Sequence, residues 1–564
     1  MEPCELMHYK DGRSGMLTNG MERSAHRALL YSTGLEEEDL HKPLIAIVNS
    51  FTEMVPGHIH LRELAQAVAQ GVWEAGGVPR EFNTIALCDG ICQGHEGMKY
   101  PLPSRELIAD SIEYMVEAHR FDAMVLLPGC DKVVPGMLMG AMRCNIPAIV
   151  VTAGPMLPGI GPDGTPITLT DMRELIGRTQ TGKLTVQQLM DAEKSALPGC
   201  GTCSMLGTAN TMGCLTEVMG MSLPGCALAG AVSAKKRRIA KASGRRIMEL
   251  LQEQVLPRQI MTREALCNGI MASMAMGAST NSTLHLPAIA HEAGIALSLS
   301  DFDAYSRKVP YLCNIKPSGA HTLLELETCG GVPAVMKAIE PLLFTDARTC
   351  TGKTVGENLA DVPTVENDII FPLEQPKSPD GGLAVLYGNL APEGAVVKQS
   401  GVKPSMHYFK GRARVFHSME EASAAVSEDR IQKGDILVIT YEGPKGGPGM
   451  REMHMTTSLI VGRGMDEMCA LITDGRFSGS TRGPCIGHIS PEAAAGGPIA
   501  AVEEGDEIII DIPGRTLTLC VPEEEIQRRL SVLKPIRKPR TPALDRYAAM
   551  VTSANLGAVL KTPD

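Results

Sequence analysis

Three consecutive residues, Cys130, Asp131 and Lys132, place a thiol, a carboxylate and an amine side by side. They follow an unbroken apolar run at residues 123–127, which is typical of a strand buried on both faces. Sulfur ligands suit soft metal ions and carboxylates suit hard ones, so a soft and a hard metal centre could lie close together here. A strand ending in a polar turn, with a buried cysteine, would have the same sequence.

Asp89 occupies a similar place, because it comes soon after an apolar run at residues 84–87 that we predict to be another strand. The carboxyl ends of parallel strands meet at one edge of a sheet, so Asp89 and Asp131 should lie close together. Two neighbouring carboxylates repel each other unless a cation lies between them. The pair therefore favours a divalent metal site.

A second pair of thiols, Cys200 and Cys203, forms a C-x-x-C pattern in a glycine-rich turn. Zinc, redox and iron–sulfur sites all use this pattern, so it is a weak indication by itself. A zinc ribbon would need a second such pair, which the sequence lacks. A redox motif of the thioredoxin kind would require a small domain that nothing else in the sequence indicates.

Two loops in the last third of the chain also stand out. Residues 443–452 are so rich in glycine that a close approach of the backbone to a ligand is expected. Residues 470–473 predict a strand, and the polar loop after it contains Ser478, a candidate nucleophile or base. Ser478 lacks the G-x-S-x-G pattern of hydrolases. A structural turn is the alternative for either loop.

The order of the elements predicts an α/β fold with a parallel sheet. Apolar runs at 44–48, 84–87, 123–127 and 146–152 alternate with amphipathic helices, and residues 258–339 are mostly helical in pattern. The composition changes near 371–382, and short β-branched runs follow, which indicates a small barrel or sandwich. We predict an α/β domain at 1–375 and a β-barrel domain at 376–564.

The composition argues against nucleic-acid-binding, membrane-spanning and secreted proteins. The 564 residues carry a formal charge of −11, which argues against a nucleic-acid surface. The sequence shows no apolar run of about 18 residues and no apolar leader at Met1, so we expect neither a membrane span nor secretion. Sixteen cysteines without a compact disulfide pattern fit a reducing cytoplasm.

Together these segments resemble the dihydroxy-acid dehydratase and phosphogluconate dehydratase family, which includes sugar-acid dehydratases. Residues 130–136 and 470–479 carry the resemblance, and it extends from about His26 to Leu560. It implies conversion of a 2,3-dihydroxy acid, such as 2,3-dihydroxyisovalerate of branched-chain amino acid biosynthesis, to a 2-keto acid. It also implies an iron–sulfur cluster and Mg²⁺ between an α/β domain and a β-barrel. We expect a cytoplasmic homodimer or a dimer of dimers.

The resemblance also implies roles for individual residues. Those matching the family's functional positions are Cys130 and Cys203 as cluster ligands, Asp89, Asp131, Lys132 and Glu452 as magnesium ligands, and Ser478 as the catalytic base. Lys132 would act as a carbamate, because an ammonium repels Mg²⁺ whereas a carbamate offers it oxygens.

One departure concerns the cluster. Members with a two-iron cluster carry a third cysteine where this chain has Gly57. The resemblance then favours a four-iron cluster over a two-iron cluster, with the remaining ligand unidentified. Cys88, Cys92 and Cys200 are the nearest spare thiols, and we expect each of them to be a bystander.

Other departures concern the substrate. Residues 203–210 look partly like the sugar-acid branch, and Leu324 replaces a glutamate that members usually carry. Residues 382–390 and 546–555 favour the dihydroxy-acid branch, which is our expectation. A sugar-acid dehydratase is the alternative. A sensor that keeps the cluster without catalysis is a third reading, although the intact Ser478 and Glu452 speak against it.

Overall fold

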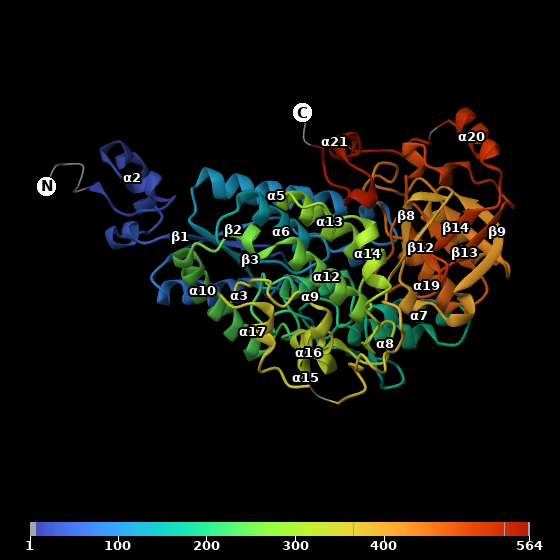
Figure 1. The fold of residues 1–564 in the computed structure, drawn as a ribbon, viewed down its shortest axis with the longest axis horizontal. Coiled ribbons are helices and arrows are strands. Elements are labelled where there is room, and N and C mark those ends of the chain that lie inside the picture. Colours follow the sequence, from blue (N-terminus) through green and yellow to red (C-terminus); the bar gives the residue numbers. More distant parts are fainter. Residues whose placement is uncertain (1–6, 365, 535, 562–564) are drawn as a thin grey trace.

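The computed structural model describes residues 7–364, 366–534 and 536–561. A small N-terminal segment with α1 (Gly15–Thr18) and α2 (Ser24–Ser32) projects from one end of the elongated molecule (Figure 1). An α/β body lies in the middle, and a β-barrel forms the other end. The predicted fold class is therefore confirmed.

The α/β body is built on a four-stranded parallel sheet with the strand order β2-β1-β3-β4. Its strands are β1 (Leu44–Asn49), β2 (Val78–Asn83), β3 (Ala123–Leu127) and β4 (Ala148–Val150). Every residue of β1, β3 and β4 is buried, as their apolar sequences predict.

The strand predicted at residues 84–87 is wrong. Those residues form no strand, and the sheet instead uses β2 just before them, in register with β1 from Leu44↔Val78 to Asn49↔Asn83. β2 is an edge strand, so it tolerates Pro79 and the charged side chains that hid it in the sequence.

Helices cover the sheet, and α3 packs against α10 beside it. The helices of the body up to residue 253 are α3 (Leu61–Glu74), α4 (Asp89–Cys92), α5 (Pro101–Ala118), α6 (Val133–Cys144), α7 (Leu169–Gln180), α8 (Val186–Ser195), α9 (Thr208–Val218) and α10 (Ala234–Glu253). A short hairpin of β5 (Gly159–Ile160) and β6 (Pro166–Ile167) precedes α7.

The following region is mostly helical, as predicted. Its helices are α11 (Pro257–Ile260), α12 (Arg263–Met276), α13 (Ser282–Ala293), α14 (Leu299–Ser306), α15 (Leu323–Thr328), α16 (Gly331–Ala338) and α17 (Val355–Leu359). They extend the large apolar core that begins under the sheet.

The C-terminal part is a closed barrel with the strand order β10-β11-β12-β8-β7-β14-β13-β9. Its strands are β7 (Ala384–Gly388), β8 (Ala391–Val397), β9 (Tyr408–Phe416), β10 (Asp435–Ile439), β11 (Ala470–Thr473), β12 (Cys485–Ser490), β13 (Glu507–Asp511) and β14 (Thr516–Leu519). Its helices are α18 (Met419–Ser427), α19 (His454–Gly462), α20 (Glu523–Val532) and α21 (Pro542–Met550). The barrel has an apolar core of its own.

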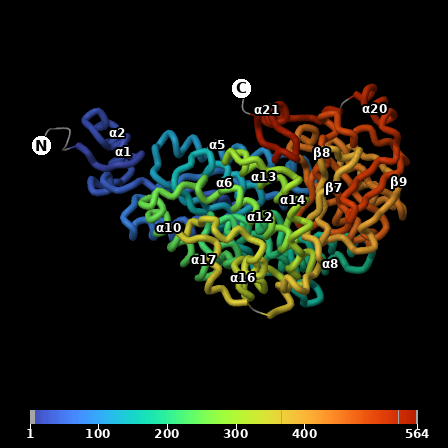
Figure 2. The backbone as a smooth tube through the Cα atoms, in the orientation of Figure 1, coloured from blue at the N-terminus to red at the C-terminus, as the bar shows by residue number. Residues whose placement is uncertain are grey.

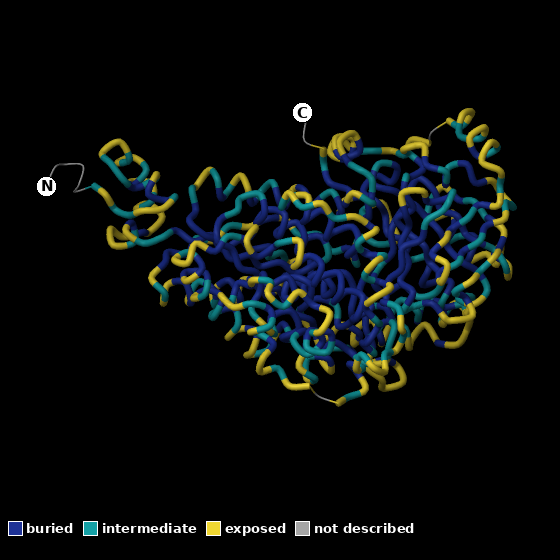
Figure 3. The backbone as a smooth tube through the Cα atoms, in the orientation of Figure 1, coloured by how far each residue is buried: buried dark blue, intermediate teal, exposed yellow. Residues whose placement is uncertain are grey.

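The two parts meet over a wide surface. Helix α7 packs against α19 of the barrel part, and the tube in Figure 2 shows the C-terminal segment returning to the α/β body near α5. There, the guanidinium of Arg105 donates to the carbonyl oxygens of Gly557 and Ala558, both at 2.8 Å. Buried chain runs through both parts and across the junction (Figure 3).

None of the helices in residues 7–364, 366–534 and 536–561 is both long enough and apolar enough to cross a membrane. The domain boundary at 375/376 stays a prediction.

Candidate active site

The loop after β3 presents Cys130 and Asp131 at the carboxyl edge of the sheet. The backbone N–H of Cys130 donates to Nε2 of His58 at 2.7 Å, and Nδ1 of His58 donates to the carbonyl of Ser50 at 2.8 Å. Burial lowers the pKa of His58 to about 4, so its ring is neutral and can accept and donate in this way. The histidine thus fixes the loop that carries the thiol.

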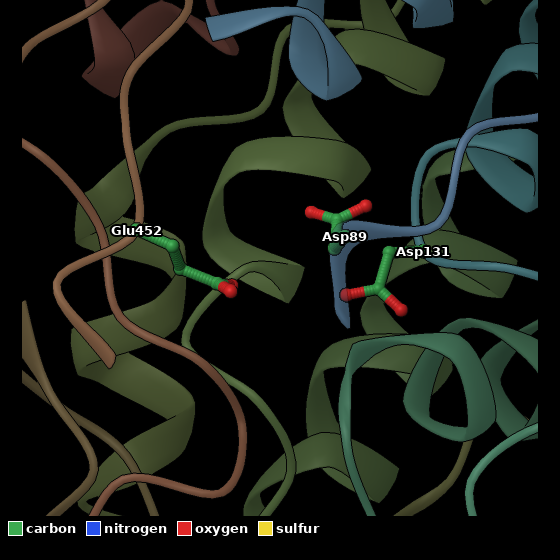
Figure 4. A group of neighbouring side chains, drawn as sticks. All are labelled: Asp89, Asp131 and Glu452. Carbon is green, nitrogen blue, oxygen red and sulfur yellow. The ribbon is translucent and has the colours of Figure 1, made fainter. Parts of the chain in front are cut away.

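Three carboxylates converge beside this loop. Asp89, Asp131 and Glu452 each offer an oxygen, and these oxygens all lie within 4.8 Å of one another. Figure 4 shows Glu452 reaching from the barrel part toward the two aspartates. Asp89 begins the short helix α4, so it reaches the site although no strand leads directly into it.

Two buried cations hold this carboxylate group together. The guanidinium of Arg476 donates to Glu452 at 2.7 Å and to Asp89 at 2.9 Å. The Nζ of Lys132 lies 3.0 Å from Asp89 and 3.8 Å from Asp131. Arg476 therefore joins a ligand candidate of the α/β body to one of the barrel part.

The protonation of the two aspartates differs. Burial, reinforced by repulsion from Asp89, raises the pKa of Asp131 to about 7. Burial also opposes ionisation of Asp89, but the charges of Lys132 and Arg476 outweigh it and hold the pKa of Asp89 below its usual value. A divalent cation would relieve the repulsion at Asp131, so the three carboxylates fit a hard metal ion.

A cavity of about 170 Å³ opens next to the carboxylates. Its lining includes three thiols, those of Cys88, Cys130 and Cys203. Burial raises the pKa of Cys203 to about 12, whereas the pKa of Cys130 is raised well above its usual value by the hydrogen bond with Cys88 and by burial. The thiols of Cys130 and Cys203 would therefore ionise when a metal takes the place of the proton. The donor set fits a soft metal centre.

Ser478 lines the same cavity, on the loop after β11. Its hydroxyl lies 2.8 Å from the hydroxyl of Ser480, which lies 3.3 Å from Nε2 of His454. Behind the loop, the amine of Lys398 donates to the carbonyl of Gly479 at 2.8 Å. The serine is thus fixed on the side of the cavity that belongs to the barrel part.

Sequence reasoning missed several residues of this site. Arg476 stood inside a recognised motif, but its two partners lie far away in the chain. Asn281 donates to the carbonyl of Phe477 at 3.2 Å, beside Ser478. Arg173 of α7 lines the cavity and donates to the carbonyl of Gly90 at 3.2 Å. No spacing in the sequence indicated any of these contacts.

Comparison with known proteins agrees with the motifs. The family described as "Dihydroxy-acid/6-phosphogluconate dehydratase N-terminal" matches residues 42–358, and its C-terminal counterpart matches residues 368–558. The chain belongs to this family. The resemblance stated from the motifs is confirmed, and so is the prediction of an enzyme of the hydro-lyase class.

Relatives cover nearly the whole chain. A "Dihydroxy-acid dehydratase" of Methanosphaera stadtmanae is 51% identical over 550 residues, which are 97% of this chain and 100% of that protein. One of Methanothermobacter thermautotrophicus is 52% identical over 551 residues, with the same coverage. One of Halothermothrix orenii is 52% identical over 550 residues, again with this coverage.

The structure brings all seven predicted site residues to one region, around the cavity and the carboxylates. Their roles, the two cofactors, the oligomeric state and the cellular location stay predictions.

Proposed function

We propose that this chain is a dihydroxy-acid dehydratase that uses Mg²⁺ and an iron–sulfur cluster of the four-iron type. It removes water from a 2,3-dihydroxy acid of the 2,3-dihydroxyisovalerate kind and yields the 2-keto acid for branched-chain amino acid biosynthesis. The observation that carries the proposal is one cavity lined by soft thiols, by Ser478 and by Asp89 and Asp131 of the carboxylate group. The names of the full-length relatives support the substrate class.

Each cofactor has a matching set of residues. Asp89, Asp131 and Glu452 would hold Mg²⁺, together with Lys132 if its amine is carbamylated. Cys130 and Cys203 would hold the cluster. When bound, the two groups supply Lewis acidity that favours departure of the 3-hydroxyl and stabilises negative charge on the substrate.

The protein's own residues complete the reaction. Ser478 takes the proton from C2, which a serine can do only where a nearby cation lowers its pKa. The hydroxyl of C3 leaves and takes up a proton to become water, so that the net loss is H from C2 and OH from C3, and the resulting enol tautomerises to the 2-keto acid. Ser480 holds the hydroxyl of Ser478 in place at 2.8 Å. Arg173, a cation in the cavity wall, suits the carboxylate of the substrate.

A sugar acid is the second candidate substrate, and one feature of the cavity favours it. Gly207 lines the wall, and a Cβ there would contact only the side chain of Met205, at 3.1 Å. A residue without a side chain at this point leaves room for a longer polyhydroxy acid.

Anaerobic purification followed by an assay with both substrate classes tests the proposal. We expect turnover of 2,3-dihydroxyisovalerate to exceed that of aldonates and 6-phosphogluconate. Cys130→Ser and Cys203→Ser should lose both the visible cluster absorbance and turnover. Preference for a sugar acid would favour the second candidate, and a cluster-loaded protein without turnover of any of these acids would favour a sensor.

A further inference from the structure

The cavity holds one thiol more than the two that match the family's cluster ligands at Cys130 and Cys203. Cys88 lines the cavity together with them, whereas Cys92 and Cys200, the other two spare thiols, lie outside its lining. The three lining cysteines come from three separate segments: the turn before α4, the loop after β3 and the glycine-rich turn before α9. Iron–sulfur clusters are held by cysteine thiolates, so three thiols that meet in one cavity fit such a cluster.

Cys88 and Cys130 are neighbours in the cavity wall. Both line the cavity, and each thiol is the side-chain partner of the other. Cys203 is near enough for its charge to act on Cys130. The three sulfur atoms thus form one group of soft donors.

A cation completes the surroundings of these thiols. Arg173 lines the same cavity, where the charge of Glu452 and then those of Cys203 and Cys88 act on it, and no carboxylate within 4.0 Å pairs with it among the described residues. A positive side chain at this point would offset the negative charge that several thiolates bring together.

Gly57 explains why a third ligand has to come from elsewhere. A Cβ at Gly57 would lie 3.2 Å from the sulfur of Cys130, so a cysteine there would direct its thiol into the same group. Gly57 offers no donor, and Cys88 approaches the same sulfur from another segment. The sequence alone made Cys88 a bystander, because it did not show this contact.

We propose that Cys88 is the third protein thiolate of the iron–sulfur cluster, beside Cys130 and Cys203. This inference rests on the proposed function, since that function brings the cluster. Three thiolates leave one iron of a four-iron cluster without a protein ligand, which is what the binding of a substrate hydroxyl requires.

The test is the iron and sulfide content of anaerobically reconstituted protein, with the visible and electron paramagnetic resonance spectra. We expect Cys88→Ser to lose at least half of the iron and sulfide bound by the wild type, whereas the matched controls Cys92→Ser and Cys200→Ser keep wild-type content. A Cys88→Ser protein with wild-type content and spectra would overturn the proposal. Failure of the wild type itself to bind a cluster would instead overturn the proposed function.

A second variant distinguishes loss of a cluster ligand from misfolding of Cys88→Ser. Gly57→Cys in the Cys88→Ser background returns a thiol to the neighbourhood of Cys130, and Gly57 has no positive φ that would oppose a side chain. Recovery of cluster binding in the double variant supports the assignment.

Alkylation of the wild type followed by mass spectrometry is independent of any variant. Cys88 should be protected in the loaded protein and become modified once the cluster is removed, and equal modification in both states would contradict the proposal.

Discussion

At the scale of single residues, the proposed reaction depends on the positions of Ser478 and its neighbour Ser480. Both line the cavity, and their hydroxyls lie 2.8 Å apart. Ser478→Ala should fold and bind both cofactors, yet lose turnover by about 10³-fold or more, within the range of a general base. Exchange of the C2 proton of bound substrate in deuterated water measures that step directly.

Ser480→Ala is the matched control for this prediction. It removes the hydroxyl that holds Ser478 but leaves the proposed base itself in place. It should therefore weaken turnover far less than Ser478→Ala does. Exchange at the wild-type rate in Ser478→Ala would show that another group takes the proton, and Ser480 would then be the first suspect.

Substitution of the carboxylates should cause a separate effect, a loss of Mg²⁺ affinity. Asp89→Asn and Glu452→Gln should each weaken Mg²⁺ binding by more than about tenfold, which is the smallest loss typical of groups that merely orient a ligand. Because oxygen ligands serve the hard ion, the iron content should not change. Titration calorimetry with Mg²⁺ measures the first effect. Glu96→Gln, which alters an exposed carboxylate, should leave both quantities unchanged.

The sequence indicated the polar residues of the site but not their contacts. Cys130, Asp131 and Ser478 follow strands whose apolar runs are plain in the sequence, so their places could be predicted. Arg476 could not, because its bond to Asp89 spans 387 residues and depends on how the two parts of the chain meet. The meeting of Cys88 with Cys130 depends in the same way on the final fold.

At the scale of elements, prediction succeeded where burial is complete and failed at the edge of the sheet. β3 is apolar throughout because both of its faces are covered, and its sequence shows this directly. β2 has one free edge, so charged residues and a proline are tolerated there, and its sequence looks less like a strand than the apolar run after it. Asp89 nevertheless reaches the other carboxylates, because the turn into α4 carries it there.

Helix α9 provides a test of buried charge away from the site. Glu217, near its end, accepts hydrogen bonds from the backbone N–H groups of Gly225 and Ala227. Burial outweighs these bonds and raises the pKa of Glu217 to about 7. The folded protein therefore binds a proton there, between about pH 4.5 and 7, that the unfolded chain lacks. Stability should fall as the pH rises through this window.

Glu217→Gln removes the titrating carboxyl, so this position no longer binds a proton in the folded or the unfolded state. The difference in free energy of unfolding, wild type minus variant, should decrease as the pH rises from 5 to 7.5, with a slope of at most about 1.4 kcal/mol per pH unit. Chemical denaturation at several pH values measures it. A difference that stays constant would mean that Glu217 is ionised in the folded protein throughout this range.

At the scale of the whole molecule, the site lies where the α/β body meets the barrel part. Asp89 and Asp131 come from the body, whereas Glu452 and Arg476 come from the barrel part. The bond from Arg476 to Asp89 and those from Arg105 to the C-terminal segment hold the two parts together without any metal. Neither part alone would contain the complete set of carboxylates, so the proposed reaction requires the junction to be intact.

Mg²⁺ should therefore strengthen this junction. Because its proposed ligands come from both parts, the ion binds the assembled molecule and not the separated parts, and it should stabilise the assembled state by about 2.7 kcal/mol at a concentration one hundred times its Kd. Chelation should lower the temperature at which the two parts come apart, as followed by calorimetry. Glu452→Gln should lose most of this dependence on Mg²⁺, whereas Glu96→Gln should keep it. If Mg²⁺ stabilised Glu452→Gln as much as the wild type, the barrel part would contribute no ligand, and the ion would belong to the α/β body alone.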